Sequence, residues 1–154
     1  MKIEIWSDVM CPFCYIGKKH FETALENIPY KDKIEVEWKS FQLNPDLSKT
    51  EVTSVKEYLI EAKGVSEEQV VGMNNQIAEM GKTVGIDFNQ ENSKVVNTSD
   101  AHRLIHFAQS KGKGNEIEEA LFKAYFTDGK NVADYATLSE IGEEIGLNKT
   151  EVLE

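Results

Sequence analysis

The segment that decides the fold is residues 2–18, which read KIEIWSDVMCPFCYIGK. Its first part, residues 2–6, alternates polar and apolar side chains, and this pattern predicts a β-strand. Pro12 follows a short loop and suits the first position of a helix, where its missing N–H costs nothing. The segment therefore predicts a strand, a loop and a helix, with Cys11 and Cys14 at the junction of loop and helix.

A second strand follows the helix that begins at Pro12. Apolar side chains recur at helical spacing from Phe21 to Ile28, and Pro29 ends the pattern. Residues 34–38 then alternate again and predict a strand. A strand, a long helix and a second strand form a βαβ unit, so we expect the two strands to run parallel.

Beyond Pro45 the pattern predicts helices only, about five of them. Ser54 with Glu57 and Ser66 with Gln69 match the capping box that begins a helix. Further apolar faces at helical spacing lie within residues 101–108, 117–124 and 138–145.

Composition and charge exclude several classes of protein. Of 154 residues, 40 % are hydrophobic and 29 % charged, which is enough to bury a core. The net charge of −10 argues against binding to a nucleic-acid backbone. No apolar run approaches the ~20 residues of a membrane span, and no apolar leader precedes residue 2, so we expect a cytoplasmic protein without membrane contact. Two cysteines are too few for a disulfide-stapled scaffold.

The motif Cys11-Pro12-Phe13-Cys14 has the context of a dithiol redox site, because it follows a short strand and begins a long helix. Unpaired N–H groups and the positive end of the helix dipole favour the thiolate of Cys11. We expect Cys11 to attack a disulfide and Cys14, one turn later, to resolve the mixed disulfide. Phe13 gives the site an apolar rim where a substrate could dock. The simpler alternative is that the two cysteines only share a core.

A zinc site is the more specific alternative to a dithiol redox site. His102 and His106 lie four residues apart on one helical face, and with Cys11 and Cys14 they have the composition of a Cys₂His₂ site. The two pairs are far apart in the sequence and must come from different helices. We therefore expect no bound metal.

Residues 7–18 are similar to the active-site segment of the DsbA-like thioredoxin superfamily, in its FrnE-type branch, although Phe13 replaces a tryptophan common there. The resemblance implies an α/β thioredoxin-like βαβ portion, residues 1–48, followed by a helical insertion domain, residues 49–154. It also implies dithiol–disulfide exchange. The similarity continues, in the family's order, through residues 41–46, 97–98, 101–103, 124–126 and 146–147.

In such folds the chain returns from the insertion to a strand that begins with a cis-proline facing the sulfurs. The three prolines here, Pro12, Pro29 and Pro45, all precede the predicted insertion. We therefore expect an incomplete thioredoxin-like fold that lacks its closing strands and final helix. We expect residues 1–154 to be the N-terminal two-thirds of a longer protein, the alternative being a naturally short form. One edge of strand 2–6 should then be open, which predicts self-association or binding of a C-terminal partner segment.

The favoured function is thiol–disulfide exchange by an oxidoreductase or isomerase that needs no metal or organic cofactor. We assign Cys11 and Cys14 to catalysis, and Pro12, Phe13 and His102 to substrate binding. The expected substrates are thiols or disulfides of proteins or of small molecules such as glutathione.

Two alternatives stay open. The first is a glutathione-dependent transferase or isomerase of the same superfamily, in which Cys11 orients a bound thiol; such relatives usually carry serine at that position. The second is a non-enzymatic zinc-binding or interaction module.

Overall fold

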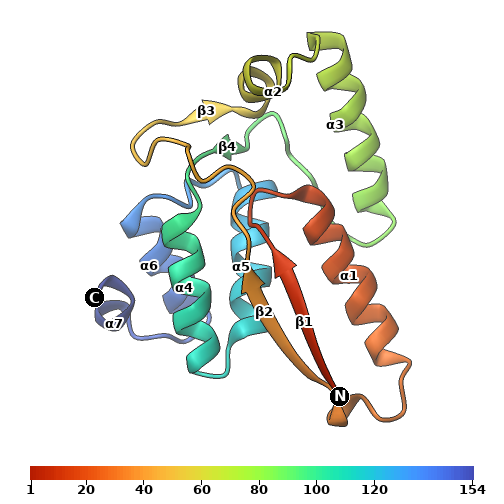
Figure 1. The fold of residues 1–154 in the computed structure, drawn as a ribbon, viewed down its shortest axis with the longest axis vertical. Coiled ribbons are helices and arrows are strands. Elements are labelled where there is room, and N and C mark those ends of the chain that lie inside the picture. The colour runs from red at the N-terminus through yellow and green to blue at the C-terminus, as the bar shows by residue number, and fades with distance from the viewer.

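The computed structural model describes residues 1–154 and confirms a βαβ unit followed by a helical region (Figure 1). Strand β1 (Lys2–Ser7) and strand β2 (Glu35–Ser40) pair in parallel, with Ile5 opposite Trp38. The helices are α1 (Pro12–Glu26), α2 (Val55–Lys63), α3 (Glu67–Lys82), α4 (Ser99–Ser110), α5 (Gly114–Phe126), α6 (Tyr135–Glu144) and α7 (Lys149–Leu153), with a 3₁₀ turn at Lys31–Lys33.

The capping boxes predicted the starts of two helices correctly. Both capping boxes form, Ser54 with Glu57 at α2 and Ser66 with Gln69 at α3. The prediction of helices only beyond Pro45 is wrong in one place. Two short strands, β3 (Thr53–Ser54) and β4 (Lys94–Val95), form an antiparallel pair. Strands of two residues are too short to show alternation. The number of helices after β2 is six rather than about five, because α7 adds a short last helix.

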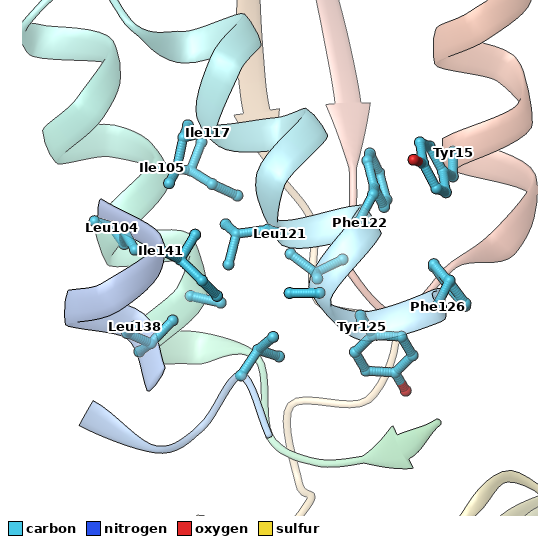
Figure 2. Packing of buried hydrophobic residues seen from close by; sticks show 14 of the residues in the cluster. Tyr15, Leu104, Ile105, Ile117, Leu121, Phe122, Tyr125, Phe126, Leu138 and Ile141 are labelled. Atoms are coloured by element: carbon cyan, nitrogen blue, oxygen red, sulfur yellow. The ribbon is translucent and has the colours of Figure 1, made fainter. Parts of the chain in front are cut away.

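One hydrophobic core joins the βαβ unit to the helices. The core cluster of 20 buried residues includes Val9, Tyr15 and Trp38 from the first part of the chain and side chains of α4, α5 and α6 (Figure 2). The ring of Tyr15 stacks on Phe122 of α5 with 4.9 Å between centroids. This packing fixes α1, which carries the cysteines, against α5. No helix of the chain combines the length and the apolar character needed to cross a membrane.

The outer edge of β2 is covered by one side chain of α4. The carboxamide of Gln109 accepts a hydrogen bond from Trp38 N–H at 2.8 Å and donates one to the Trp38 carbonyl at 3.3 Å. A side chain therefore takes the place of a neighbouring strand at that edge.

The outer edge of β1 has no such cover. The carbonyls of Met1 and Ser7 accept hydrogen bonds from the β2 side of the sheet. Because backbone groups of successive residues in a strand point to alternate edges, those of Lys2, Glu4 and Trp6 face the other edge. No strand within residues 1–154 pairs with it.

The Gln109 contact gives a first prediction. Gln109→Leu keeps the size of the side chain but leaves two backbone groups of Trp38 without partners, so it should lower the free energy of unfolding by about 1–3 kcal/mol. Urea denaturation followed by circular dichroism measures this. The control is Gln76→Leu on an exposed position of α3, which should leave the stability within about 0.5 kcal/mol of wild type. Equal stability of the two variants would contradict the role given to Gln109.

Candidate active site

The two cysteines lie where β1 has turned into α1. Cys11 is the N-cap residue of α1, and its Sγ accepts the N–H of Cys14 at 3.3 Å. Pro12 occupies the first turn, as the sequence predicted. Both cysteines are free thiols and half-buried, and Cys14 packs against the hydrophobic core. Cys14 is therefore the inner thiol of the pair.

The two thiols titrate as one unit. Their mutual hydrogen bond lowers the pKa of Cys14 to about 6 and raises the pKa of Cys11. This differs from the expectation that the helix end places the thiolate on Cys11. The N–H groups of Cys14 and Phe13 do lower the pKa of Cys11, as expected, but the hydrogen bond with the Cys14 thiol raises it by more. Because one proton lies between two sulfurs, the pair loses its first proton below the ordinary thiol pKa and holds the second above it. Such a pair can supply a thiolate near neutral pH.

The loop before Cys11 is held by the buried carboxylate of Asp8, which is 1 % exposed. Its Oδ2 accepts the Leu43 N–H at 2.7 Å. Its Oδ1 lies 2.8 Å from the hydroxyl of Thr98 and 3.0 Å from Nε2 of His102. Burial alone would raise the pKa of Asp8, but the hydrogen bonds, that of His102 first, hold it below its ordinary value. The Asp8 carbonyl in turn accepts the N–H of Cys11 at 3.1 Å.

Of the residues assigned to substrate binding, Pro12 and Phe13, which stand between the two cysteines in the sequence, line an apolar pocket. His102 does not line this pocket. It is 6 % exposed and faces Asp8, so its contact is with the loop that carries the cysteines. His106 instead lies 2.9 Å from the hydroxyl of Ser40.

The two histidines thus have separate partners. No group of three or more His, Cys, Asp or Glu side chains in the chain is arranged to hold a metal ion. The geometry gives the zinc alternative no support.

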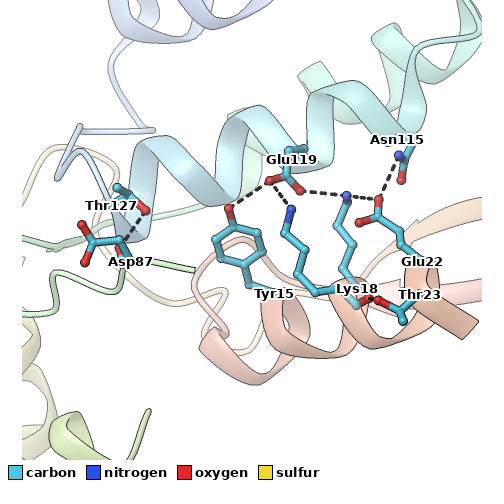
Figure 3. A network of polar contacts seen from close by, with 9 residues as sticks. Tyr15, Lys18, Glu22, Thr23, Asp87, Asn115, Glu119 and Thr127 are labelled. Atoms are coloured by element: carbon cyan, nitrogen blue, oxygen red, sulfur yellow. Dashed lines mark hydrogen bonds and ion pairs between the residues drawn. The ribbon is translucent and has the colours of Figure 1, made fainter. Parts of the chain in front are cut away.

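An ion-pair network ties α1 to α5 (Figure 3). Lys18, with a nearly fully buried side chain, pairs with Glu22 of its own helix and with Glu119 of α5 at 2.9 Å. Lys19 and the hydroxyl of Tyr15 also bind Glu119, at 2.6 and 3.1 Å. Periodicity could not find this network, since it depends on residues about a hundred positions apart.

A buried acid near the thiols was missed by the sequence analysis. Glu118 is 2 % exposed, and its Oε2 has no hydrogen-bond partner. Burial raises its pKa to about 8; Lys18 opposes the shift, and the charges of Cys14 and Asp8 add to it. One feature of the sequence pointed to the burial of Glu118: apolar Phe122, four residues later, lies on the same face of α5.

This acid makes the stability depend on pH. In the unfolded chain Glu118 ionises near its ordinary pKa of 4.5, whereas in the folded chain it holds its proton up to about pH 8. Between these values the folded state binds more protons, so rising pH lowers the free energy of unfolding, by about 1.4 kcal/mol per pH unit. Glu118→Gln should remove this decline, as measured by urea denaturation at pH 5 to 8. Glu116→Gln, an exposed position of the same helix, should keep it. A parallel decline in wild type and Glu118→Gln would contradict the assignment.

Comparison with known proteins places this geometry in a family. Residues 2–154 match the model of the DSBA-like thioredoxin domain. The uncharacterized protein YwbO of Bacillus subtilis (strain 168) is 33 % identical over 147 residues, which are 95 % of this chain and 66 % of that protein.

Solved structures agree with this match. A probable DsbA oxidoreductase from Streptomyces coelicolor is similar with a TM-score of 0.93 and 34 % identity, over 99 % of this chain and 65 % of that one. The cytosolic disulfide reductase DsbM from Pseudomonas aeruginosa shares the fold, with a TM-score of 0.67 and 14 % identity over 99 % of this chain and 69 % of that one. The chain thus spans 66 % and 65 % of the length of its two more similar relatives. With its βαβ unit, helical insertion and cysteine pair at the start of α1, it belongs to the family of DSBA-like thioredoxin domains.

Proposed function

We propose that this protein catalyses thiol–disulfide exchange through Cys11 and Cys14, as a dithiol oxidoreductase or isomerase of the FrnE-type branch. The observation that carries the proposal is the pair of free thiols at the start of α1, with Cys11 as the N-cap and Cys14 one turn later. The pair loses one proton near neutral pH and shares the one that remains. Membership in a family that includes a probable DsbA oxidoreductase supports it.

The proposed reaction has two steps. Cys11 passes its proton to the Cys14 sulfur through the hydrogen bond between them and attacks one sulfur of a substrate disulfide. A Cys11–substrate disulfide forms, the substrate disulfide breaks, and the released sulfur takes up the proton from Cys14. The thiolate of Cys14 then attacks Cys11 Sγ, which releases the second substrate thiol and leaves a Cys11–Cys14 disulfide. Two electrons pass from the cysteine pair to the substrate. The reverse sequence oxidises a dithiol substrate.

The second cysteine separates this proposal from a glutathione-dependent transferase or isomerase. Such an enzyme needs one group to orient a bound thiol and gains nothing from a resolving cysteine. Here Cys14 shares its proton with Cys11 and lies one helical turn away, as a resolver must.

A trapping experiment tests the order of attack. Cys14→Ser cannot resolve the intermediate, so it should accumulate mixed disulfides with native insulin, whose disulfides Cys11 attacks, and Cys11→Ser should not. Non-reducing gels and mass spectrometry of residues 1–154 measure the adducts. Both variants should reduce insulin far more slowly than wild type. Equal trapping by the two variants would contradict the assigned order, and undiminished turnover in Cys11→Ser would refute the proposal.

We also propose that residues 1–154 associate with a second copy through the open edge of β1. An uncovered strand edge offers unpaired N–H and C=O groups to another chain, and exposed Trp6 lies at the end of this one.

Glu4 allows a direct test of that edge. Glu4→Pro removes an N–H that faces away from β2 and should shift the mass measured by light scattering toward the monomer. Glu4→Ala removes the same carboxylate but keeps the N–H, so it should associate as wild type does. A wild-type monomer over a hundredfold range of concentration would overturn this proposal.

A further inference from the structure

A cavity of about 680 Å³ lies at the end of the βαβ unit away from the cysteines (Figure 1). Its lining residues come from the second half of α1, the starts of β1 and β2, the end of α4 and the start of α5. Phe21, on one wall, is ten residues beyond Cys11, which places it roughly 15 Å along the axis of α1. The cavity is therefore separate from the candidate active site.

The apolar part of the lining consists of Phe21, Leu25, Val36 and Trp38. Trp38 is only 2 % exposed, and its Nε1–H has no hydrogen-bond partner. A buried donor without a partner is unfavourable, so a carbonyl group that enters the cavity can gain a hydrogen bond there. An apolar side chain that enters gains from leaving water.

The outer edge of β2 faces this cavity at Val36. The N–H of Glu35 binds the Met1 carbonyl on the β1 side of the strand. Because alternate residues of a strand point their backbone groups to opposite edges, those of Val36 and Trp38 face the outer edge. Gln109 binds both groups of Trp38, whereas the N–H and the carbonyl of Val36 have no partner in the chain. An extended peptide can pair with that free N–H and carbonyl.

The charges around the cavity favour a cationic occupant. Four carboxylates and one ammonium group line it. Two of the carboxylates already have ion pairs, Glu22 with a lysine of its own helix and Glu37 with Lys2, which is that ammonium group. The other two, Glu35 and Glu116, are exposed and have no cationic partner. The net charge of −10 on the whole chain attracts a basic partner as well.

We propose that this cavity and the adjacent edge of β2 bind an extended basic segment of another polypeptide. The backbone of that segment pairs with Val36, one of its apolar side chains enters the cavity, and its lysine or arginine side chains lie near Glu35 and Glu116. A polyamine offers the charges but neither the backbone groups nor the apolar side chain. The proposal does not depend on thiol–disulfide exchange, and it gives the protein a second binding surface at the end opposite the cysteines.

The first test uses Trp38 as its own reporter. The sequence has two tryptophans, so Trp6→Phe leaves Trp38 as the sole source of indole fluorescence. Titration with acetyl-Val-Lys-Val-Lys-Val-amide should change the Trp38 emission and give a dissociation constant. Acetyl-Val-Glu-Val-Glu-Val-amide and spermine should each bind at least roughly tenfold more weakly. Binding of spermine as tight as that of the lysine peptide would overturn the inference.

Charge-reversal variants separate the cavity from the charge of the whole chain. Glu35→Lys with Glu116→Lys should weaken binding of the lysine peptide by roughly tenfold or more. Glu68→Lys with Glu140→Lys changes the net charge equally at exposed positions outside the cavity, and it should weaken binding much less. Equal weakening by the two double variants would count against the cavity as the site.

A modified peptide tests the pairing with Val36. The same lysine peptide with N-methyl groups on residues 2 to 4 keeps its charge and its valines but has no N–H at those residues, so it should bind roughly tenfold more weakly. Undiminished binding of the methylated peptide would refute pairing along β2. Cys11→Ser should bind the unmodified peptide as tightly as wild type does, and a loss of binding in that variant would place the peptide at the cysteines instead.

Discussion

The structure around the cysteines depends on the buried carboxylate of Asp8. A buried charge is tolerated only where it is paired and hydrogen-bonded, and the donors to Asp8 come from two distant segments. Leu43 lies in the loop after β2, and Thr98 and His102 lie at the start of α4. Removing one donor would leave a poorly compensated charge in the interior. The loop that delivers Cys11 to the end of α1 is therefore held by the helical region as well as by the sheet.

The other side of α1 is held by a different set of contacts. Lys18 and Tyr15 bind Glu119 of α5, and the Tyr15 ring stacks on Phe122. These contacts fix the helix along its length and in rotation. Together with the Asp8 contacts they set where Pro12 and Phe13 lie, the two residues of the cysteine motif that line the apolar pocket. The helices packed against the βαβ unit thus position the candidate active site, besides enlarging the core.

How much could be predicted from the sequence depends on how far apart in the sequence the residues of each feature lie. The βαβ unit, both capping boxes and the place of Cys11 at a helix start depend on residues within a few positions of each other, and all are confirmed. The β3–β4 pair depends on two-residue strands about forty positions apart, and it was missed. Glu118 and Gln90 are ordinary polar residues in the sequence. Only the packing of distant segments buries them and leaves their oxygens unpartnered. The expectation for His102 rested on the family resemblance, whereas the structure turns its ring toward Asp8.

The buried acids Asp8 and Glu118 both interact with the charge of Cys14. The hydrogen bond between the two thiols raises the pKa of Cys11 and lowers the pKa of Cys14. The N–H groups at the start of α1 oppose the first shift, and burial and the charge of Asp8 oppose the second. Glu118 would add a second negative charge near Cys14, but burial keeps its proton in place up to about pH 8. A dithiol whose thiolate is stabilised is a stronger oxidant as the disulfide, because its reduced form is favoured. The charge state of Glu118 therefore acts on the same balance as the helix end. Near neutral pH the neutral acid leaves the thiolate stabilised by the hydrogen bond between the two sulfurs, and ionisation of Glu118 above its pKa weakens that stabilisation.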